Sequence, residues 1–202
     1  MKRPLISVIA LSLMLAMCLS VRSQTEPDLE RKIEEIFRYR RQEGENYDAK
    51  ARIEALGNTE EVKVILLKML TKHKYADVRS LESRFLVGAV LMLGEMKAKQ
   101  AAEPLSQMLF DQKVHENIRA LAARSLGQID AVGSKPLLLK ALANTSDYFG
   151  VRVEAAEALA KTKDPQVLKA LQRSSRAEKD DFVRQKFETA AKELRARMQA
   201  AQ

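Results

Sequence analysis

The feature that most constrains this chain is an internal repeat of about 33 residues. Four helical runs end on Leu-Gly or Leu-Ala, and successive copies are 37, 33 and 33 residues apart. Each is followed by a short linker and a second apolar run, so the repeating unit is predicted to be a helical hairpin. Such a hairpin cannot bury its apolar face alone and must stack on its neighbours. The four dipeptides are Leu56-Gly57, Leu93-Gly94, Leu126-Gly127 and Leu159-Ala160.

This repeat also predicts the fold class. No strand pattern accompanies it, so we predict an all-α protein, a right-handed α-solenoid of about four hairpins with capping helices at both ends. Residues 24–45 are predicted to form the N-terminal capping helix, which begins near Pro27 and ends near Gly44. Residues 46–202 are predicted to form the repeat domain.

Capping residues and apolar spacing predict the ends and faces of the helices. Asp77 is predicted to cap a first helix about two turns longer than its counterparts, which would explain the 37-residue step. Ser134 and Asp164 are predicted to cap two of the second helices. The glycine of each Leu-Gly dipeptide is predicted to adopt the left-handed backbone that stops a helix. In the last helical run, Phe182 and Phe187 are expected on one apolar face.

The first residues have the pattern of an export signal. Lys2 and Arg3 precede an uncharged apolar stretch, residues 4–21, and a small residue then stands before Gln24. We therefore predict that residues 1–23 are a signal peptide. The rest of the chain is expected to be exported, either to the periplasm or out of a bacterial cell.

Two other readings of this segment remain open. Residues 4–21 contain about enough apolar residues to span a bilayer, so an uncleaved membrane anchor is the main alternative. Cys18 ends a short sequence that resembles a bacterial lipoprotein box, although Met17 replaces the small residue expected before the cysteine. Contact with a membrane is expected only through this segment, if it is left uncleaved or becomes lipidated.

Charge and cysteine content limit the classes of partner and the sources of stability. Removing residues 1–23 takes away three bases, Lys2, Arg3 and Arg22, and no acid, so the net charge falls from +8 to +5. No block of like charge is long enough to form a nucleic-acid-binding arm, and no nucleic acid is expected as a partner. Because Cys18 is the single cysteine, the exported part cannot form a disulfide within the chain.

Two of the repeats allow a family resemblance to be stated. The sequences IRALAARSLG at 118–127 and VRVEAAEALA at 151–160 resemble the first helix of the short HEAT repeat found in phycobilisome lyase-like HEAT proteins. Pro136-Leu137 and the run 165–168 resemble the start of the second helix in that family. The resemblance covers roughly residues 48–200. It implies a stack whose second helices line a concave face.

The resemblance also assigns structural roles. Arginines near the start of first helices, Arg79, Arg119, Arg152 and Arg184, are expected to form a ladder to acidic residues that joins successive repeats. Upstream residues such as Asp77, Asn117 and Asp181 accompany them. The leucine of each dipeptide is expected to fill the space between layers. The predicted structural residues are Leu56, Gly57, Leu93, Gly94, Arg119, Leu126, Gly127, Arg152 and Leu159.

A search for catalytic chemistry finds no recognisable site. His73 and His115 fall in predicted turns and do not have the spacing of metal ligands. The seven glycines never cluster into a phosphate-binding loop, and no nucleophile has a recognisable setting. We therefore predict a protein that is not an enzyme, with no metal and no cofactor.

The predicted binding surface is the concave face formed by the second helices. Most outward positions there are long and polar, while Leu139 is expected at the edge or exposed. The loop containing Tyr148-Phe149 is a second candidate, although these aromatics are expected to pack on the next helix. The predicted partner-binding residues are Lys63, Lys68, Lys72, Gln107, Leu139, Lys140, Lys169, Gln172 and Arg173.

These observations favour a non-enzymatic exported scaffold that binds a protein or peptide along its concave face. One alternative is a chromophore lyase or phycobiliprotein-handling factor, suggested by the family resemblance but disfavoured by the signal peptide and the lack of a suitable cysteine. Another alternative is a module that binds an anionic polymer, either nucleic acid or glycan, through the basic residues of that face.

Overall fold

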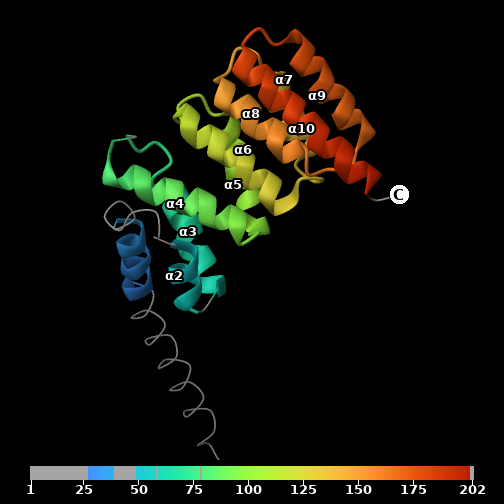
Figure 1. Cartoon of the computed structure of the whole chain (residues 1–202). Coiled ribbons are helices and arrows are strands. Elements are labelled where there is room, and N and C mark those ends of the chain that lie inside the picture. Colours follow the sequence, from blue (N-terminus) through green and yellow to red (C-terminus); the bar gives the residue numbers. More distant parts are fainter. Residues whose placement is uncertain (1–26, 39–48, 58, 78, 201–202) are drawn as a thin grey trace, which may run out of the picture. The chain divides into compact units, whose positions relative to one another are not determined.

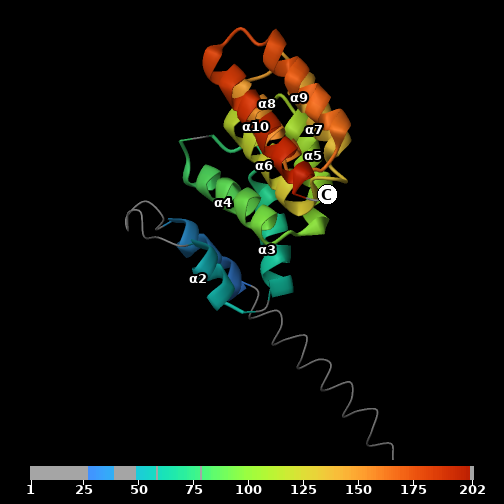
Figure 2. The same ribbon diagram turned by 45° about the vertical axis from the view of Figure 1, so that its right-hand side comes forward.

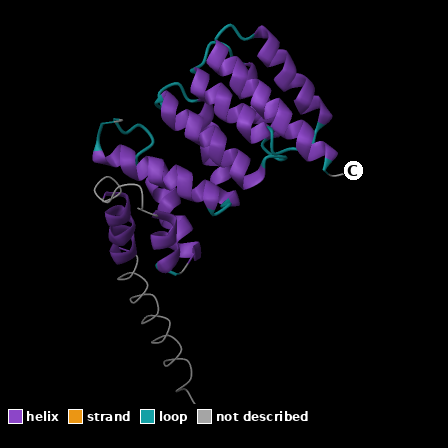
Figure 3. Ribbon diagram, viewed as in Figure 1, coloured by secondary structure: helices purple, strands orange, loops and turns teal. Residues whose placement is uncertain are grey.

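The computed structural model describes residues 27–38, 49–57, 59–77 and 79–200. Every regular element in these ranges is a helix, and none is a strand (Figure 3). The chain divides into two compact units, Met1–Ile65 and Leu66–Gln202, which are described one at a time. The predicted all-α fold is therefore confirmed for the described residues.

The first unit contains a helix over residues 27–38, α2 (Ala49–Ala55) and the start of α3 (Thr59–Lys72). Residues 27–38 are helical and lie within the predicted capping helix, while the predicted end of that helix near Gly44 lies outside the described residues. Gly57 follows α2 with a φ of 66°, which is the left-handed conformation expected of a helix-stopping glycine. Leu56, beside it, is half-buried.

The second unit arranges its helices in two layers. The first helices of the hairpins, α4, α6, α8 and α10, pack side by side in chain order, and the second helices, α5, α7 and α9, form the other layer (Figures 1 and 2). After the end of α3, the elements are α4 (Leu81–Glu95), the short 3-10 helix η2 (Lys99–Ala101), α5 (Ala102–Phe110), α6 (Glu116–Asp130), α7 (Lys135–Ala143), α8 (Phe149–Leu159), α9 (Pro165–Ala177) and α10 (Asp181–Gln199).

The repeated leucines lie in the core of this unit. Leu93, Leu126 and Leu159 are each fully buried, near the ends of α4, α6 and α8. Burying a leucine side chain contributes about 1.5 to 3 kcal/mol, so one such position per repeat is a substantial part of the packing energy. The same first helices bury several alanines, and such small side chains allow neighbouring first helices to approach closely.

Two glycines of the repeat do not stop helices, contrary to the prediction. Gly94 and Gly127 lie inside α4 and α6, and neither has a positive φ. A Cβ atom on Gly94 would lie 2.7 Å from the hydroxyl oxygen of Ser125, and one on Gly127 would overlap the methyl group of Ala158. These glycines are needed because the adjacent first helix passes too close for a side chain.

The longer first step of the repeat also has a different cause from the one predicted. Ser80, and not Asp77, caps α4, because the Ser80 side chain accepts a hydrogen bond from the Ser83 amide at 3.2 Å. Asp77 instead accepts from the Arg79 amide in the preceding turn. α4 has 15 residues, as α6 does, so it is not two turns longer. The connection before α4, 73–80, is longer than the connection 111–115 before α6, and Leu93 stands further into its helix than Leu126 does.

The predicted caps of the second helices have mixed outcomes. Asp164 caps α9 as predicted, accepting from the Gln166 amide at 2.8 Å. Ser134 makes no capping bond to α7 and instead donates to the Leu126 carbonyl at 3.4 Å.

None of the described helices is long and apolar enough to cross a membrane. The predicted signal segment, residues 1–23, lies outside the described ranges.

Candidate binding surface

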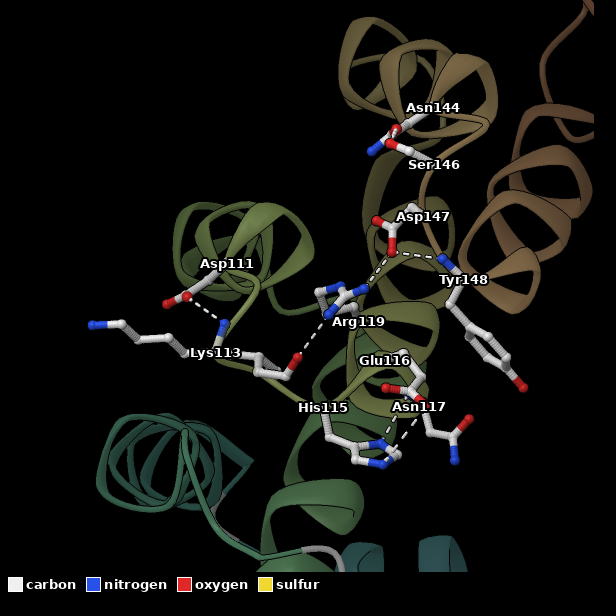
Figure 4. Close-up of polar contacts among 11 residues, drawn as sticks. Asp111, Lys113, His115, Glu116, Asn117, Arg119, Asn144, Ser146, Asp147 and Tyr148 are labelled. Carbon is white, nitrogen blue, oxygen red and sulfur yellow. Dashed lines mark hydrogen bonds and ion pairs between the residues drawn. The ribbon is translucent and has the colours of Figure 1, made fainter.

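A buried ion pair joins the α6 repeat to the next one. Arg119 donates to the Val114 carbonyl at 2.8 Å and to the carboxylate of Asp147, which lies in the connection before α8 (Figure 4). The two side chains are only 6% and 4% exposed. Asp147 also accepts from the Tyr148 amide at 2.7 Å, so this carboxylate fixes the start of α8 as well as the arginine.

The same contact recurs one repeat later. Arg152 of α8 pairs with Glu178, in the connection before α10, and both side chains are about nine-tenths buried. Burial alone would raise the pKa of Glu178, but hydrogen bonds from the Asp180 amide and from Arg152 outweigh burial and lower that pKa. The two contacts are the same kind of link at equivalent positions of successive repeats.

The other two arginines of the expected ladder are not part of it. Arg79 is exposed, and Arg184 pairs with Asp181 of its own helix. Within the described ranges, the arginines that link successive repeats are therefore Arg119 and Arg152. The acids that accept them come from the connection that follows each hairpin, and not from Asp77 or Asn117.

A third link between repeats uses a lysine and a tyrosine. Asp111, after α5, accepts hydrogen bonds at 2.8 Å from both Lys74 and Tyr75, which precede α4. These bonds, with a further one from the Lys113 amide, lower the pKa of Asp111 to about 2. The carboxyl is therefore charged across the physiological pH range and holds the two connections together.

These links engage the two acidic residues that flank α9 in the sequence, Asp164 and Glu178. Asp164, before α9, pairs with Lys135 at 2.5 Å, and Glu178, after α9, pairs with Arg152. The sequence of α9, PQVLKALQRSSRA, contains no acid. Its three cations therefore have no acidic counterpart on their own helix.

The outward side of α9 brings together three of the sequence-predicted residues. Lys169 and Arg173 are exposed and Gln172 is half-buried, while Val167, Leu171 and Ser175 point into the unit. A depression of about 520 Å³ is bounded by five residues of this helix. They are Lys169, Gln172, Arg173, Arg176 and Ala177.

Arg176 was not predicted, although it stands three residues after Arg173 on the same helical face. We call the outward residues of the last three second helices the second-helix face. They are Gln107 of α5, Leu139 and Lys140 of α7, and Lys169, Gln172, Arg173 and Arg176 of α9.

The α7 and α5 parts of the second-helix face differ in their contacts. Lys140 is exposed, and its ammonium group lies 4.5 Å from the centre of the Phe110 ring, which is a cation–π distance. Leu139 is half-buried at the edge of α7. Gln107 of α5 donates to Glu103, one turn earlier, at 2.8 Å. Because α5 packs on α7 and α7 packs on α9, these residues belong to one layer.

The predicted lysines of α3 fall on both sides of the unit boundary. Lys63 belongs to the first unit and pairs with Glu60 at 2.7 Å. Lys68 and Lys72 belong to the second unit and are exposed. Only the last two can therefore be considered together with the second-helix face.

A second concavity lies on the first helices and was not predicted. A groove of about 680 Å³ runs over α6, α8 and α10. Ala158 and Ala190 are among its lining residues. Arg124, which also lines it, forms a bidentate ion pair with Glu154, with hydrogen bonds of 2.6 and 2.8 Å. The groove contains three acids and three bases, so it has no net charge of either sign.

An exposed aromatic cluster corrects two further expectations. Phe182 does not share the buried face of Phe187: it is 56% exposed, while the adjacent Val183 points inward. Its ring meets that of Phe149 edge-on, with centres 6.4 Å apart, and Phe149 also contacts Tyr148. Phe149 is 43% exposed and therefore is not packed away against its own helix.

Both histidines make contacts within the fold. His115 caps α6 by accepting from the Asn117 amide at 3.2 Å (Figure 4), and the His73 ring packs edge-on against Phe85. In the part of the chain that the structure describes, no group of three His, Cys, Asp or Glu side chains is placed to hold a metal ion.

Comparison with known families identifies the repeat. A family model described as HEAT repeats matches residues 65–149 and, in a second overlapping match, residues 112–192. The matches together extend over more than half of the 202-residue chain and contain every helix from α4 to α9. A search of curated proteins found no match.

Proposed function

We propose that this chain, which belongs to the HEAT-repeat family, is a non-enzymatic scaffold that is exported and binds a protein or peptide partner along its second-helix face. Helical-repeat proteins present extended surfaces that suit contact with another macromolecule. The observation that carries the proposal is the outward side of α9, where three long cationic side chains surround a depression.

A comparison with the groove on the first helices supports the choice of the second-helix face. Around that groove, Arg124 pairs with Glu154 and Lys186 pairs with Glu157, so four of the six charged side chains that line it are paired within the chain. On α9, by comparison, Lys169, Arg173 and Arg176 form no ion pair with a described residue. Unsatisfied charge is available for a partner, whereas a paired charge must first be separated from its neighbour.

Export is proposed from the sequence of residues 1–23 alone. If it holds, the scaffold acts in the periplasm or outside the cell, where its partner must also be found. The low cysteine content agrees with a domain whose stability comes from packing and from the links between repeats.

Site-specific cross-linking tests which face binds. A photoreactive amino acid placed at Gln172, on the second-helix face, is compared with the same group at Gln185, on the first-helix groove. Both positions carry glutamine, so the two variants lose the same side chain. A partner linked in living cells through position 172 and not through 185 supports the proposal, and linkage only through 185 assigns binding to the first helices.

A further inference from the structure

We infer that the second-helix face recognises an acidic segment of a partner protein, with α9 as the main contact. This inference rests on the proposed function and adds to it the chemistry of the partner. The cations at positions 169, 173 and 176 follow helical spacing and lie on one side of α9. Over these eight residues the helix rises by about 10 Å, so the charges form a short row.

The row is uncompensated because of the links between repeats. Asp164 and Glu178, the acids flanking α9, are held by Lys135 and Arg152 of earlier elements. Both carboxyl groups have lowered pKa values, for Asp164 chiefly through the hydrogen bond from Lys135. They remain charged and engaged, and therefore leave the cations of α9 for an external anion.

The last helix, α10, differs from α9 in its pattern of charges. α10 also carries exposed cations, Lys192, Arg195 and Arg197, but acids are interleaved with its basic residues, among them Glu188 and Glu193. An acidic ligand on α10 would meet repulsion beside each attraction. α9 carries cations and no acid of its own, and the nearby Glu188 of α10 accepts from Ser175 on the inward side of α9. The outward row therefore has the charge complementarity that favours an acidic partner.

The shape of the site favours a peptide over a nucleic acid. The depression of about 520 Å³ is within the range of about 300 to 1,000 Å³ that is typical of ligand pockets. A protein that neutralises about 6 to 10 phosphates of duplex DNA uses a Lys or Arg for each of them. Three cations on α9 and Lys140 on α7 are too few, whereas they match a segment with three or four carboxylates.

Binding of a defined probe tests the inference. The protein is purified from its native host with the N-terminus that it has there. It is titrated against a labelled peptide of alternating Glu and Ser, and against the same peptide with Gln in place of Glu. We expect the Glu peptide to bind and the Gln peptide to bind at least about tenfold more weakly, with affinity for the Glu peptide falling as salt is added.

Two triple variants with the same change in charge locate the site. K169E/R173E/R176E on α9 is expected to weaken binding of the Glu peptide by at least about tenfold. K192E/R195E/R197E on α10 is expected to change it by less than about twofold. Helical circular dichroism checks folding, and the milder K169Q/R173Q replaces the α9 variant if reversal unfolds the chain.

Four outcomes would overturn the inference. They are equal binding of the Glu and Gln peptides, equal loss in the α9 and α10 variants, no binding of the Glu peptide, and tighter α9-dependent binding of an oligonucleotide or sulfated glycan than of the peptide. If the Glu peptide fails to bind while position 172 still cross-links a native partner, the acidic-segment inference fails and the proposed function stands. If position 172 captures nothing either, both fail.

Discussion

Arg119 of α6 and Asp147, one repeat later, form an ion pair with both side chains almost completely buried. The pair joins a first helix to the connection that begins the next hairpin, and Arg152 with Glu178 repeats the arrangement. A stack of hairpins has contacts only between neighbours, so each such link fixes the position of one repeat against the next. Correct placement of α9 therefore depends on these pairs.

Replacing Asp147 with alanine should strongly destabilise the protein. The substitution leaves the Arg119 guanidinium buried without its charge partner, which costs about 3 to 5 kcal/mol in the free energy of unfolding. Glu154→Ala is the control, because it breaks the more exposed pair with Arg124 and should cost about 0 to 1 kcal/mol. Chemical denaturation measures both. Equal losses would show that the buried link does not hold the repeats together.

Gly127→Ala should also destabilise, by about 1 to 3 kcal/mol, because the added methyl group overlaps Ala158 on the adjacent first helix. The direction of the change in stability is informative, because the same substitution at an open helical position stabilises the protein by about 0.5 to 1 kcal/mol. Adding Ala158→Gly should restore part of the loss by removing the facing methyl group. A stabilised Gly127→Ala protein would contradict the close approach of α6 and α8.

The contact of Asp111 with Lys74 and Tyr75 should make stability fall in acid. Because folding lowers the pKa of Asp111 from 3.8 to about 2, its contribution is complete above the unfolded pKa and is lost as pH falls through this interval. Asp111→Asn should therefore lower the melting temperature at about pH 6 and have little effect at about pH 2. A difference that stays constant between these pH values would exclude this titration.

The N-terminal segment is expected to be removed on export. N-terminal sequencing of the protein from its native host should give a start near Gln24, and fractionation should place the product outside the cytoplasm. A membrane-bound product that retains residue 1 would identify residues 4–21 as an anchor. A product that begins at a lipid-modified Cys18 would identify a lipoprotein.

The repeat fold was predictable because burial follows local periodicity. Leu126 follows an alanine-rich run in α6, and leucines recur at the equivalent place in the other repeats, so this spacing predicts a core position from sequence alone. The role of Gly127 was not predictable in this way. A glycine near a helix end indicates a left-handed stop, and only the packed structure shows Ala158 facing it.

The acidic partners of the ladder arginines could not be predicted, because the number of residues between arginine and acid is not constant. Asp147 stands 28 residues after Arg119, while Glu178 stands 26 residues after Arg152. What they share is a place in the connection before the next first helix, which becomes clear only when the hairpins are stacked. Phe182 was misplaced for a different reason. It stands five residues before Phe187, which turns it about 140° away around the helix, whereas Val183, four residues before Phe187, lies on the same side and is buried.

The helix that carries the candidate surface could be predicted from the sequence, but the lack of acidic partners for its cations could not. Lys169, Gln172 and Arg173 were identified as outward residues of a second helix, and they do border one depression. The absence of acidic counterparts depends on Asp164 and Glu178 being engaged elsewhere. That follows from contacts between repeats and could not be derived from α9 alone.

Capture of the native partner by charge-reversed protein tests the central claim most directly. In K140E/K169E/R173E, the changed residues are exposed and lie on α7 and α9, so each change should alter the free energy of unfolding by no more than about 0.5 kcal/mol. The K192E/R195E/R197E variant supplies the same change in net charge on α10. We predict that the native partner is lost from the first variant and retained by the second, with both proteins folded. Retention of every native partner by the folded K140E/K169E/R173E protein would contradict binding at the second-helix face.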